Sequence, residues 1–215
     1  MEVLKTVIGQ RILVLDGAMG TMLQQYGFDD EKFRGDIFRE LKGPLVSNFD
    51  LLTLSQPQAV KEVHNSYLQA GADIITTNTF SSNSLSLSDY SAEKYVRLLN
   101  YQAARLARES ADSFTASDPS KPRFVAGSMG PTNKSCSISP RVEEPGYRAV
   151  TFEELRSAYK IQAEALLDGG VDLLLIETVF DTLNAKAALF AIDEIRQERG
   201  CEIPVMLSAT VSGNS

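Results

Sequence analysis

Few cysteines, few basic residues and no long apolar run distinguish this 215-residue sequence. Two cysteines, Cys136 and Cys201, do not suggest a disulfide framework, so we expect a cytoplasmic location. Lysine and arginine number 21 against 28 acidic residues, and a net charge of −7 argues against nucleic acid or an anionic membrane as a partner. No apolar run approaches the roughly 18 residues of a membrane span, and residues 1–10 lack the apolar centre of a signal peptide. The length suffices for one sizeable core.

A nucleotide fingerprint is also missing. The turn at residues 16–20 follows an apolar run, but it lacks the full glycine spacing of a phosphate-binding motif. Its leading residue, Asp16, would repel a pyrophosphate. The glycines therefore indicate a tight strand-to-helix turn. This favours a closed barrel of parallel strands over an open nucleotide-binding sheet, although composition alone permits both.

Segments typical of strands and helices alternate along the whole chain. Because each connection is long enough for a crossover, the alternation predicts a parallel sheet with helices outside it. Polar, irregular stretches at 28–54, 81–91 and 131–148 are predicted to be loops, and the first of them to lie at the active face. The predicted strands are 11–16, 73–80, 124–130, 171–176 and 203–210, and the predicted helices are near 22–26, 57–70, 92–113, 151–168 and 182–199.

Polar side chains collect where the predicted strands end. Parallel strands carry ligands at their carboxyl ends, so we expect these side chains at one rim. Two carboxylates, Asp16 and Glu177, can grip an ammonium group, while the backbone N–H groups of Gly17 and Ala18 can receive a carboxylate. This chemistry suits an α-amino acid. The residues predicted at the rim are Asp16, Thr77, Asn78, Ser128, Glu177, Ser208 and Thr210.

The same residues can instead have a structural role and bind no substrate. Glu177 can be a helix-capping acid or part of a surface ion pair. Both acids can instead pair with the basic residues of the third long loop, which are Lys134, Arg141 and Arg148. His64 lies on the apolar stripe of a helix, so we expect a core histidine with satisfied hydrogen bonds and not a ligand.

Four ordered motifs together resemble the N-terminal homocysteine-binding domain of cobalamin-dependent methionine synthase, of the homocysteine S-methyltransferase family. They are 16–22 (DGAMGTM), 71–80 (GADIITTNTF), 130–133 (GPTN) and 176–188 (IETVFDTLNAKAA), and the match spans nearly the whole chain. The resemblance implies a (β/α)8 TIM barrel, with about the first five β/α units in one domain over 1–215. It also implies that homocysteine is held by its amino acid end. The substrate-binding residues expected from it are Asp16, Gly17, Ala18, Glu177, Thr178 and, with weaker support, Asn78.

The resemblance also implies a zinc-dependent methyl transfer. In the family, three cysteine thiolates hold Zn²⁺, which lowers the pKa of the homocysteine thiol from the roughly 8.5 of a free thiol. Methylcobalamin on another domain, recharged from methyltetrahydrofolate, would donate the methyl group. The family's zinc cysteines belong beyond Ser215, and neither Cys136 nor Cys201 matches a ligand motif. We therefore expect no metal ligand and no catalytic residue in this chain, and no methyl transfer by it alone.

Several departures and alternatives accompany this interpretation. Thr76 stands where relatives often carry an acid, and 44–48 resembles an insertion. Five strands of an eight-stranded barrel would leave open edges, which predicts self-association. The folate and cobalamin domains of the parent enzyme are expected partners. The alternatives are a stand-alone homocysteine methyltransferase that uses betaine or S-methylmethionine, and a non-catalytic amino acid binding fragment.

Overall fold

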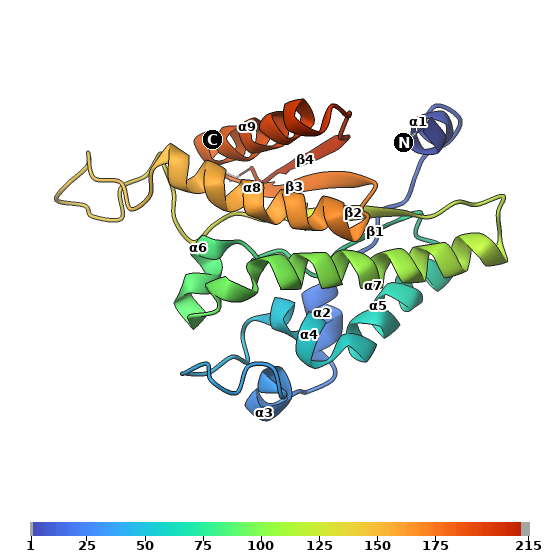
Figure 1. The fold of residues 1–215 in the computed structure, drawn as a ribbon, viewed down its shortest axis with the longest axis horizontal. Helices are drawn as coiled ribbons and strands as arrows, with labels where there is room; N and C mark the ends of the chain where they lie inside the picture. Colours follow the sequence, from blue (N-terminus) through green and yellow to red (C-terminus); the bar gives the residue numbers. More distant parts are fainter. Residues whose placement is uncertain (1, 212–215) are drawn as a thin grey trace.

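A parallel four-stranded sheet runs through the centre of the computed structural model, which describes residues 2–211. Its strands lie in sequence order, each beside the next, and all neighbours are parallel. This order requires a crossover between consecutive strands and is that of a TIM-type barrel left open, so the predicted α/β class and partial barrel are confirmed. The strands are β1 (Ile74–Thr76), β2 (Phe124–Met129), β3 (Leu173–Val179) and β4 (Val205–Ala209) (Figure 1).

The predicted first strand, 11–16, is wrong as a regular strand. The segment runs parallel to β1 but forms only an isolated bridge between Leu15 and Ile74. The Asp16 N–H donates to the Ile74 carbonyl at 2.9 Å, which still fixes the segment beside β1. Ile12 is 88% exposed, so the segment has little cover on its outer side. The segment therefore runs beside β1 without forming a regular ladder of hydrogen bonds.

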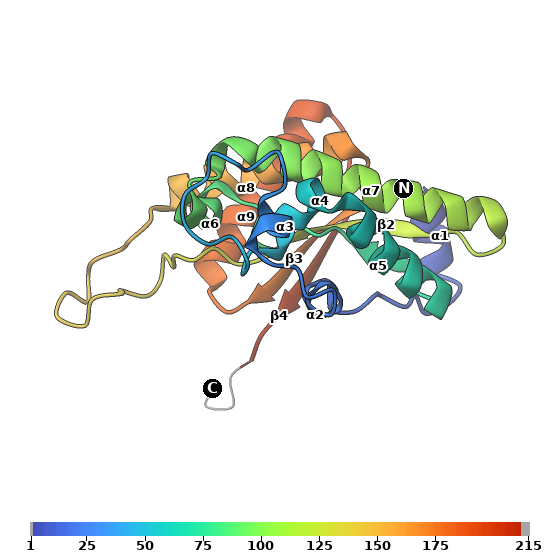
Figure 2. The ribbon, with the colours of Figure 1, turned by 90° about the horizontal axis from the view of Figure 1, so that it is seen from below.

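Helices pack against the sheet and against one another (Figures 1 and 2). Helix α8 begins with a capping box, in which Thr151 and Glu154 exchange hydrogen bonds. Asp181 caps α9, and its side chain accepts from the N–H groups of Leu183 and Asn184. No helix in the described part of the chain is long and apolar enough to cross a membrane. The main helices are α5 (Pro57–Ala70), α7 (Val96–Ser117), α8 (Phe152–Gly169) and α9 (Thr182–Arg199), and α1 (Glu2–Ile8) lies near the N-terminus.

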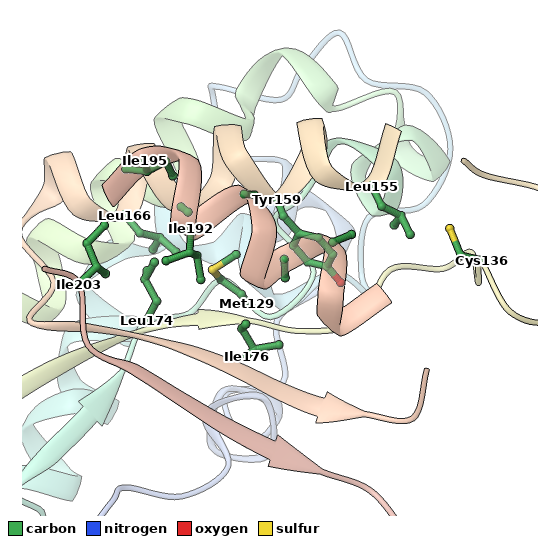
Figure 3. Packing of buried hydrophobic residues seen from close by; sticks show 14 of the residues in the cluster. Met129, Cys136, Leu155, Tyr159, Leu166, Leu174, Ile176, Ile192, Ile195 and Ile203 are labelled. Carbon is green, nitrogen blue, oxygen red and sulfur yellow. The ribbon is translucent and has the colours of Figure 1, made fainter. Parts of the chain in front are cut away.

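Alternation along the strands separates a helix-covered face from a barrel-interior face. On the helix side, Met129, Leu174 and Ile176 pack with residues of α8 and α9 in the largest core cluster (Figure 3). The other face carries a smaller cluster that includes Leu4 of α1 and Leu175 of β3. Successive side chains of a strand point to opposite faces, so a residue two positions after an interior-facing residue also faces the interior. The ends of β2 and β3 therefore present polar side chains to the interior.

Two of the three predicted loops contain short helices, so their description as irregular is wrong. Segment 28–54 contains α3 (Asp30–Arg34), η1 (Phe49–Leu51) and α4 (Leu52–Ser55), and it packs with α2 (Met19–Gln24) around buried side chains such as Phe33, Phe38 and Leu45. Segment 81–91 contains α6 (Ser84–Leu87) and η2 (Ser88–Tyr90), and η3 (Glu93–Tyr95) precedes α7. The third segment, 131–148, has neither helix nor strand and projects from the body, drawn in yellow to gold (Figures 1 and 2).

Candidate functional site

A cleft of about 700 Å³ opens at the carboxyl ends of the strands. Its walls come from the segments that follow residues 11–16, β1 and β2, from η1, and from the ends of β2 and β3. Leu175 also lines the cleft, two residues before Glu177 on β3. Five of the six predicted substrate-binding residues line this cleft, namely Asp16, Gly17, Ala18, Asn78 and Glu177. The structure therefore brings the two strand-end acids to one hollow.

Asp16 is held at the wall of the cleft by Thr76 of β1. The Thr76 N–H donates to Asp16 Oδ2 at 2.8 Å, and the Thr76 hydroxyl lies 3.1 Å from Oδ1 and 3.2 Å from Oδ2. The pKa of Asp16 is raised to about 7, chiefly by burial and also by the charge of Glu177, while the bonds from Thr76 oppose the rise. Near neutral pH, Asp16 is therefore partly protonated.

Glu177 reaches the cleft from the end of β3. The hydroxyl of Ser128, on the neighbouring strand β2, donates a short hydrogen bond to Glu177 Oε1. Burial raises the pKa of Glu177, and the bond from Ser128 lowers it. Ser128 is itself buried, with its N–H bonded to Thr77 Oγ1 at 2.9 Å. The acid is thus supported by a fixed strand and not by a mobile loop.

A third acid, Asp50, lines the same cleft, and the sequence did not single it out. Its Oδ2 accepts hydrogen bonds from the Ser81 N–H at 2.7 Å and from the Ser82 hydroxyl at 2.8 Å. Burial raises the pKa of Asp50 to about 6, and the charge of Glu177 adds to the rise. The one sequence signal was an acid inside the apolar run of 49–52, which indicates a buried carboxylate with a specific partner.

Within residues 2–211, these three acids form no salt bridge with lysine or arginine. The alternative in which basic residues of the third loop neutralise them is therefore wrong. Arg141 pairs with Glu144 at 2.9 Å, and Arg148 donates to backbone carbonyls of its own loop. The cleft presents negative charge with free capacity to receive a cation.

Backbone donors lie beside the acids. Gly17 and Ala18 follow Asp16 directly, and neither N–H donates a hydrogen bond to another described residue. A Cβ on Gly17 would lie 3.0 Å from the hydroxyl oxygen of Tyr67, so the close approach of that ring favours glycine. The Tyr67 hydroxyl donates to the Ala18 carbonyl at 3.3 Å and holds the turn. Two N–H groups are therefore available next to a carboxylate.

The profile of the homocysteine S-methyltransferase family matches residues 13–215. The chain belongs to the homocysteine S-methyltransferase family. Crystal structures of the Escherichia coli homocysteine methyltransferase MmuM have the same fold. The metallated form matches with a TM-score of 0.71 at 22% identity, covering 97% of this chain and 66% of that one. The oxidised form gives 0.70 at 24% identity over 95% and 64% of the two chains, and the apo form gives 0.64 at 25% over 95% and 62%. The chain thus spans about two thirds of the length of these structures.

Two of the predicted substrate-binding residues, Thr178 and Asn78, are placed differently from the other four. Thr178 does not line the cleft, and its backbone adopts a left-handed conformation with φ of 57° directly after Glu177. Asn78 does line it, but its amide donates to the Phe49 carbonyl at 2.8 Å and to Thr53 Oγ1 at 3.2 Å. Asn78 therefore fixes the segment that carries Asp50.

Some of the other predicted rim residues line the cleft and some do not. Thr77 and Ser128 line the cleft, as the strand-end argument predicts. Ser208 and Thr210, at the end of β4, are exposed and do not line it. The prediction that all strand ends share one hollow is wrong for β4, because that strand lies at the far edge of the sheet from β1.

The residues present do not fit a three-thiolate metal site. Cys136 is buried, with its Sγ 3.6 Å from the Val150 carbonyl, and burial raises the pKa of its thiol. Cys201 is exposed near the end of α9. Across residues 2–211, no three histidine, cysteine or acidic side chains are arranged to hold a metal ion. Neither cysteine lines the cleft.

Proposed function

We propose that this chain is the homocysteine-binding part of a methionine synthase. In the complete enzyme, methylcobalamin, recharged by methyltetrahydrofolate, would methylate the zinc-activated thiol of homocysteine. The observation that carries the proposal is the pair Asp16 and Glu177, which line one cleft without a basic partner among the described residues. A primary ammonium group supplies the missing positive charge and up to three hydrogen-bond donors.

The amino acid would bind with its two charged groups apart. Its ammonium would lie between Asp16 and Glu177, and its carboxylate would accept from the N–H groups of Gly17 and Ala18, which have no other described acceptor. The side chain would then extend toward the open end of the cleft. In this arrangement the described residues bind and orient the substrate.

Activation of the sulfur is a separate task. Zinc would supply a Lewis acid that stabilises the thiolate. Residues 2–211 contain no matching ligand set, so the proposal assigns them no role in holding the metal. In the proposal, residues 2–211 bind homocysteine but do not by themselves transfer a methyl group.

One observation favours a second methyl donor class. Phe49, Phe80 and Tyr90 line the cleft together with its acids. Aromatic faces attract methylated cations, as in quaternary ammonium sites. A stand-alone homocysteine methyltransferase that takes its methyl group from betaine or S-methylmethionine is therefore the alternative, and the likeness of fold to MmuM is compatible with it. Assays of the intact native protein with each donor distinguish the two, and binding without transfer from any donor supports the non-catalytic alternative.

Calorimetric titration with L-homocysteine, with and without Zn²⁺, tests the proposal. We expect saturable binding without added metal, and at least a roughly tenfold loss of affinity in Glu177→Gln, since a buried charge-assisted hydrogen bond is lost. Asp89→Asn is the matched control. Asp89 also lines the cleft, but it accepts from Asn133 at 2.8 Å, and we expect less than a roughly twofold change. Absent binding, or equal affinity in both variants, would contradict the proposal.

A further inference from the structure

We propose that Thr76 is a positioning residue of the amino acid site, and that its hydroxyl sets the pH range in which the cleft accepts an ammonium group. The inference rests on the proposed function. It concerns a residue that makes no direct contact with the substrate in that proposal and acts through Asp16.

The contacts of Asp16 identify Thr76 as its support. Three of the close contacts to the Asp16 carboxylate come from Thr76: one from the backbone N–H at 2.8 Å and two from the hydroxyl at 3.1 and 3.2 Å. No other side chain of residues 2–211 donates to this carboxylate. Thr76 is the last residue of β1 and is paired with Ala126 of β2, so its own position is fixed by the sheet. The carboxylate is thereby oriented along the wall of the cleft.

The other groups that face Asp16 disfavour its charge. Glu177 approaches from β3, and its charge raises the pKa of Asp16. Burial raises the pKa of Tyr67 on α5, and the charge of Asp16 adds to that rise. Asp50 lines the same cleft from η1. No lysine or arginine lines the cleft in the described part of the chain. The Thr76 hydroxyl is consequently the one described side chain that stabilises the ionised form of Asp16 by a hydrogen bond.

A proton balance follows from these surroundings. An ammonium group binds the ionised carboxylate, so binding to a cleft in which Asp16 is protonated releases one proton to solvent. The hydroxyl of Thr76 lowers the pKa of Asp16, and removing it raises that pKa. Amino acid affinity in a variant without the hydroxyl would therefore weaken near neutral pH and recover at higher pH.

The substitution Thr76→Val tests this directly, because valine keeps the shape of threonine and its backbone N–H but lacks the hydroxyl. Thr76→Ser keeps the hydroxyl and is the matched control. Methionine is the titrant, since it has the same ammonium and carboxylate as homocysteine without a thiol that titrates. The dissociation constant is measured by calorimetry from pH 5.5 to 8.5. Buffers of different ionisation enthalpy report the released proton.

We expect the pH midpoint of binding to rise by about one unit in Thr76→Val and to stay within roughly 0.3 units of wild type in Thr76→Ser. At the upper end of the range all three proteins should bind within about threefold of one another. A purely structural role of Thr76 would weaken binding equally at every pH. That result, or an unchanged midpoint in Thr76→Val, overturns the inference.

A second ligand separates this inference from the proposed function. The compound 4-(methylthio)butanoate is methionine without its ammonium group, so its binding should not weaken as Asp16 becomes protonated in any of the three proteins. If wild type binds methionine and Thr76→Val has the same pH profile, only the role of Thr76 is wrong. If wild type binds neither methionine nor homocysteine at any pH, the proposed function itself fails.

Discussion

The Ser128 hydroxyl on β2 donates its hydrogen bond to Glu177 on β3, so one acid of the cleft is held in place by the adjacent strand. Parallel pairing sets this contact, because the register aligns Ser128 with Leu175, two residues before Glu177 and on the same face. Asp16 is held in the same manner by Thr76 of β1. Each acid therefore has a sheet residue behind it, which fixes its direction before any ligand arrives.

Ser128→Ala should weaken amino acid binding at pH 7 by about three- to tenfold, because the hydrogen bond from Ser128 lowers the pKa of Glu177 and its removal raises that pKa. The loss of affinity should become smaller as pH rises. Ser86→Ala is the control, since Ser86 lines the cleft and its hydroxyl donates no hydrogen bond to a described residue. Calorimetry on both variants checks the difference. Equal affinities would show that the contact from Ser128 does not matter for binding.

Asp16→Asn should stabilise the fold at high pH. The pKa of Asp16 is about 7 in the fold and 3.8 as an unperturbed group, so the folded state holds an extra proton between these values. Protonated Asp16 therefore favours the folded state at acidic pH, and this contribution to the free energy of unfolding is lost as pH rises toward 7. The amide of Asn does not ionise, so the variant avoids this loss. We expect its free energy of unfolding to exceed that of wild type by about 1–2 kcal/mol at pH 8, allowing for solvent screening, and by less at pH 5. Urea unfolding at the two pH values measures it, and a larger gain at pH 5 would contradict the assignment.

The sequence predicted the meeting of Asp16 and Glu177 because parallel strands end at one edge, whatever the details of packing. It did not predict Asp50, whose place depends on contacts across the fold. The Asn78 amide holds the Phe49 carbonyl, and the Ser81 N–H and Ser82 hydroxyl bind Asp50 itself. Such contacts join residues about thirty positions apart and leave no local pattern.

The helices were predicted for a different reason, since capping and glycine termination are local. The capping box at Thr151 and the left-handed Gly170 mark the two ends of α8 in the sequence itself. The segment 28–54 was not predicted because its short helices are stabilised by packing against α2 and not by periodicity.

His64 is buried, as the sequence predicts, but it is not satisfied. Neither ring nitrogen has a hydrogen-bond partner among the described residues, and burial lowers the pKa of His64 to about 4. Its folded pKa lies below the unperturbed 6.5, so stability is complete above pH 6.5 and decreases as pH falls toward 4. His64→Leu should therefore gain about 2 kcal/mol over wild type at pH 5. Unfolding midpoints at pH 5 and 8 test this, and a variant less stable than wild type at pH 5 would contradict it.

Asp181 ties the projecting segment 131–148 to the start of α9. Its carboxylate accepts from the Ser135 and Ser137 hydroxyls, from the Ser137 N–H at 3.0 Å and from the Leu183 N–H at 2.9 Å. These bonds lower the pKa of Asp181 to about 2, so its contribution is present above pH 4 and is lost as pH falls toward 2. Asn184 Oδ1 also accepts a hydrogen bond from the Cys136 N–H at 3.0 Å.

Asp181→Ala should destabilise the fold by about 2–3 kcal/mol, since it removes a helix cap and several partly buried hydrogen bonds. Hydrogen exchange should become faster at residues 135–138 while β2 and β3 change little. Asp193→Asn is the matched control, because that exposed acid on the same helix bonds only Gln197 in the described structure. Unchanged exchange at 135–138 in Asp181→Ala would show that the segment is held by other contacts.

A crystal structure of the protein with bound L-homocysteine tests the central claim most directly. The account predicts the amino nitrogen within hydrogen-bond distance, about 3 Å, of both Asp16 and Glu177, with the carboxylate at the N–H groups of Gly17 and Ala18. Homocysteine bound elsewhere, or bound in this cleft with its carboxylate toward the two acids, would contradict it.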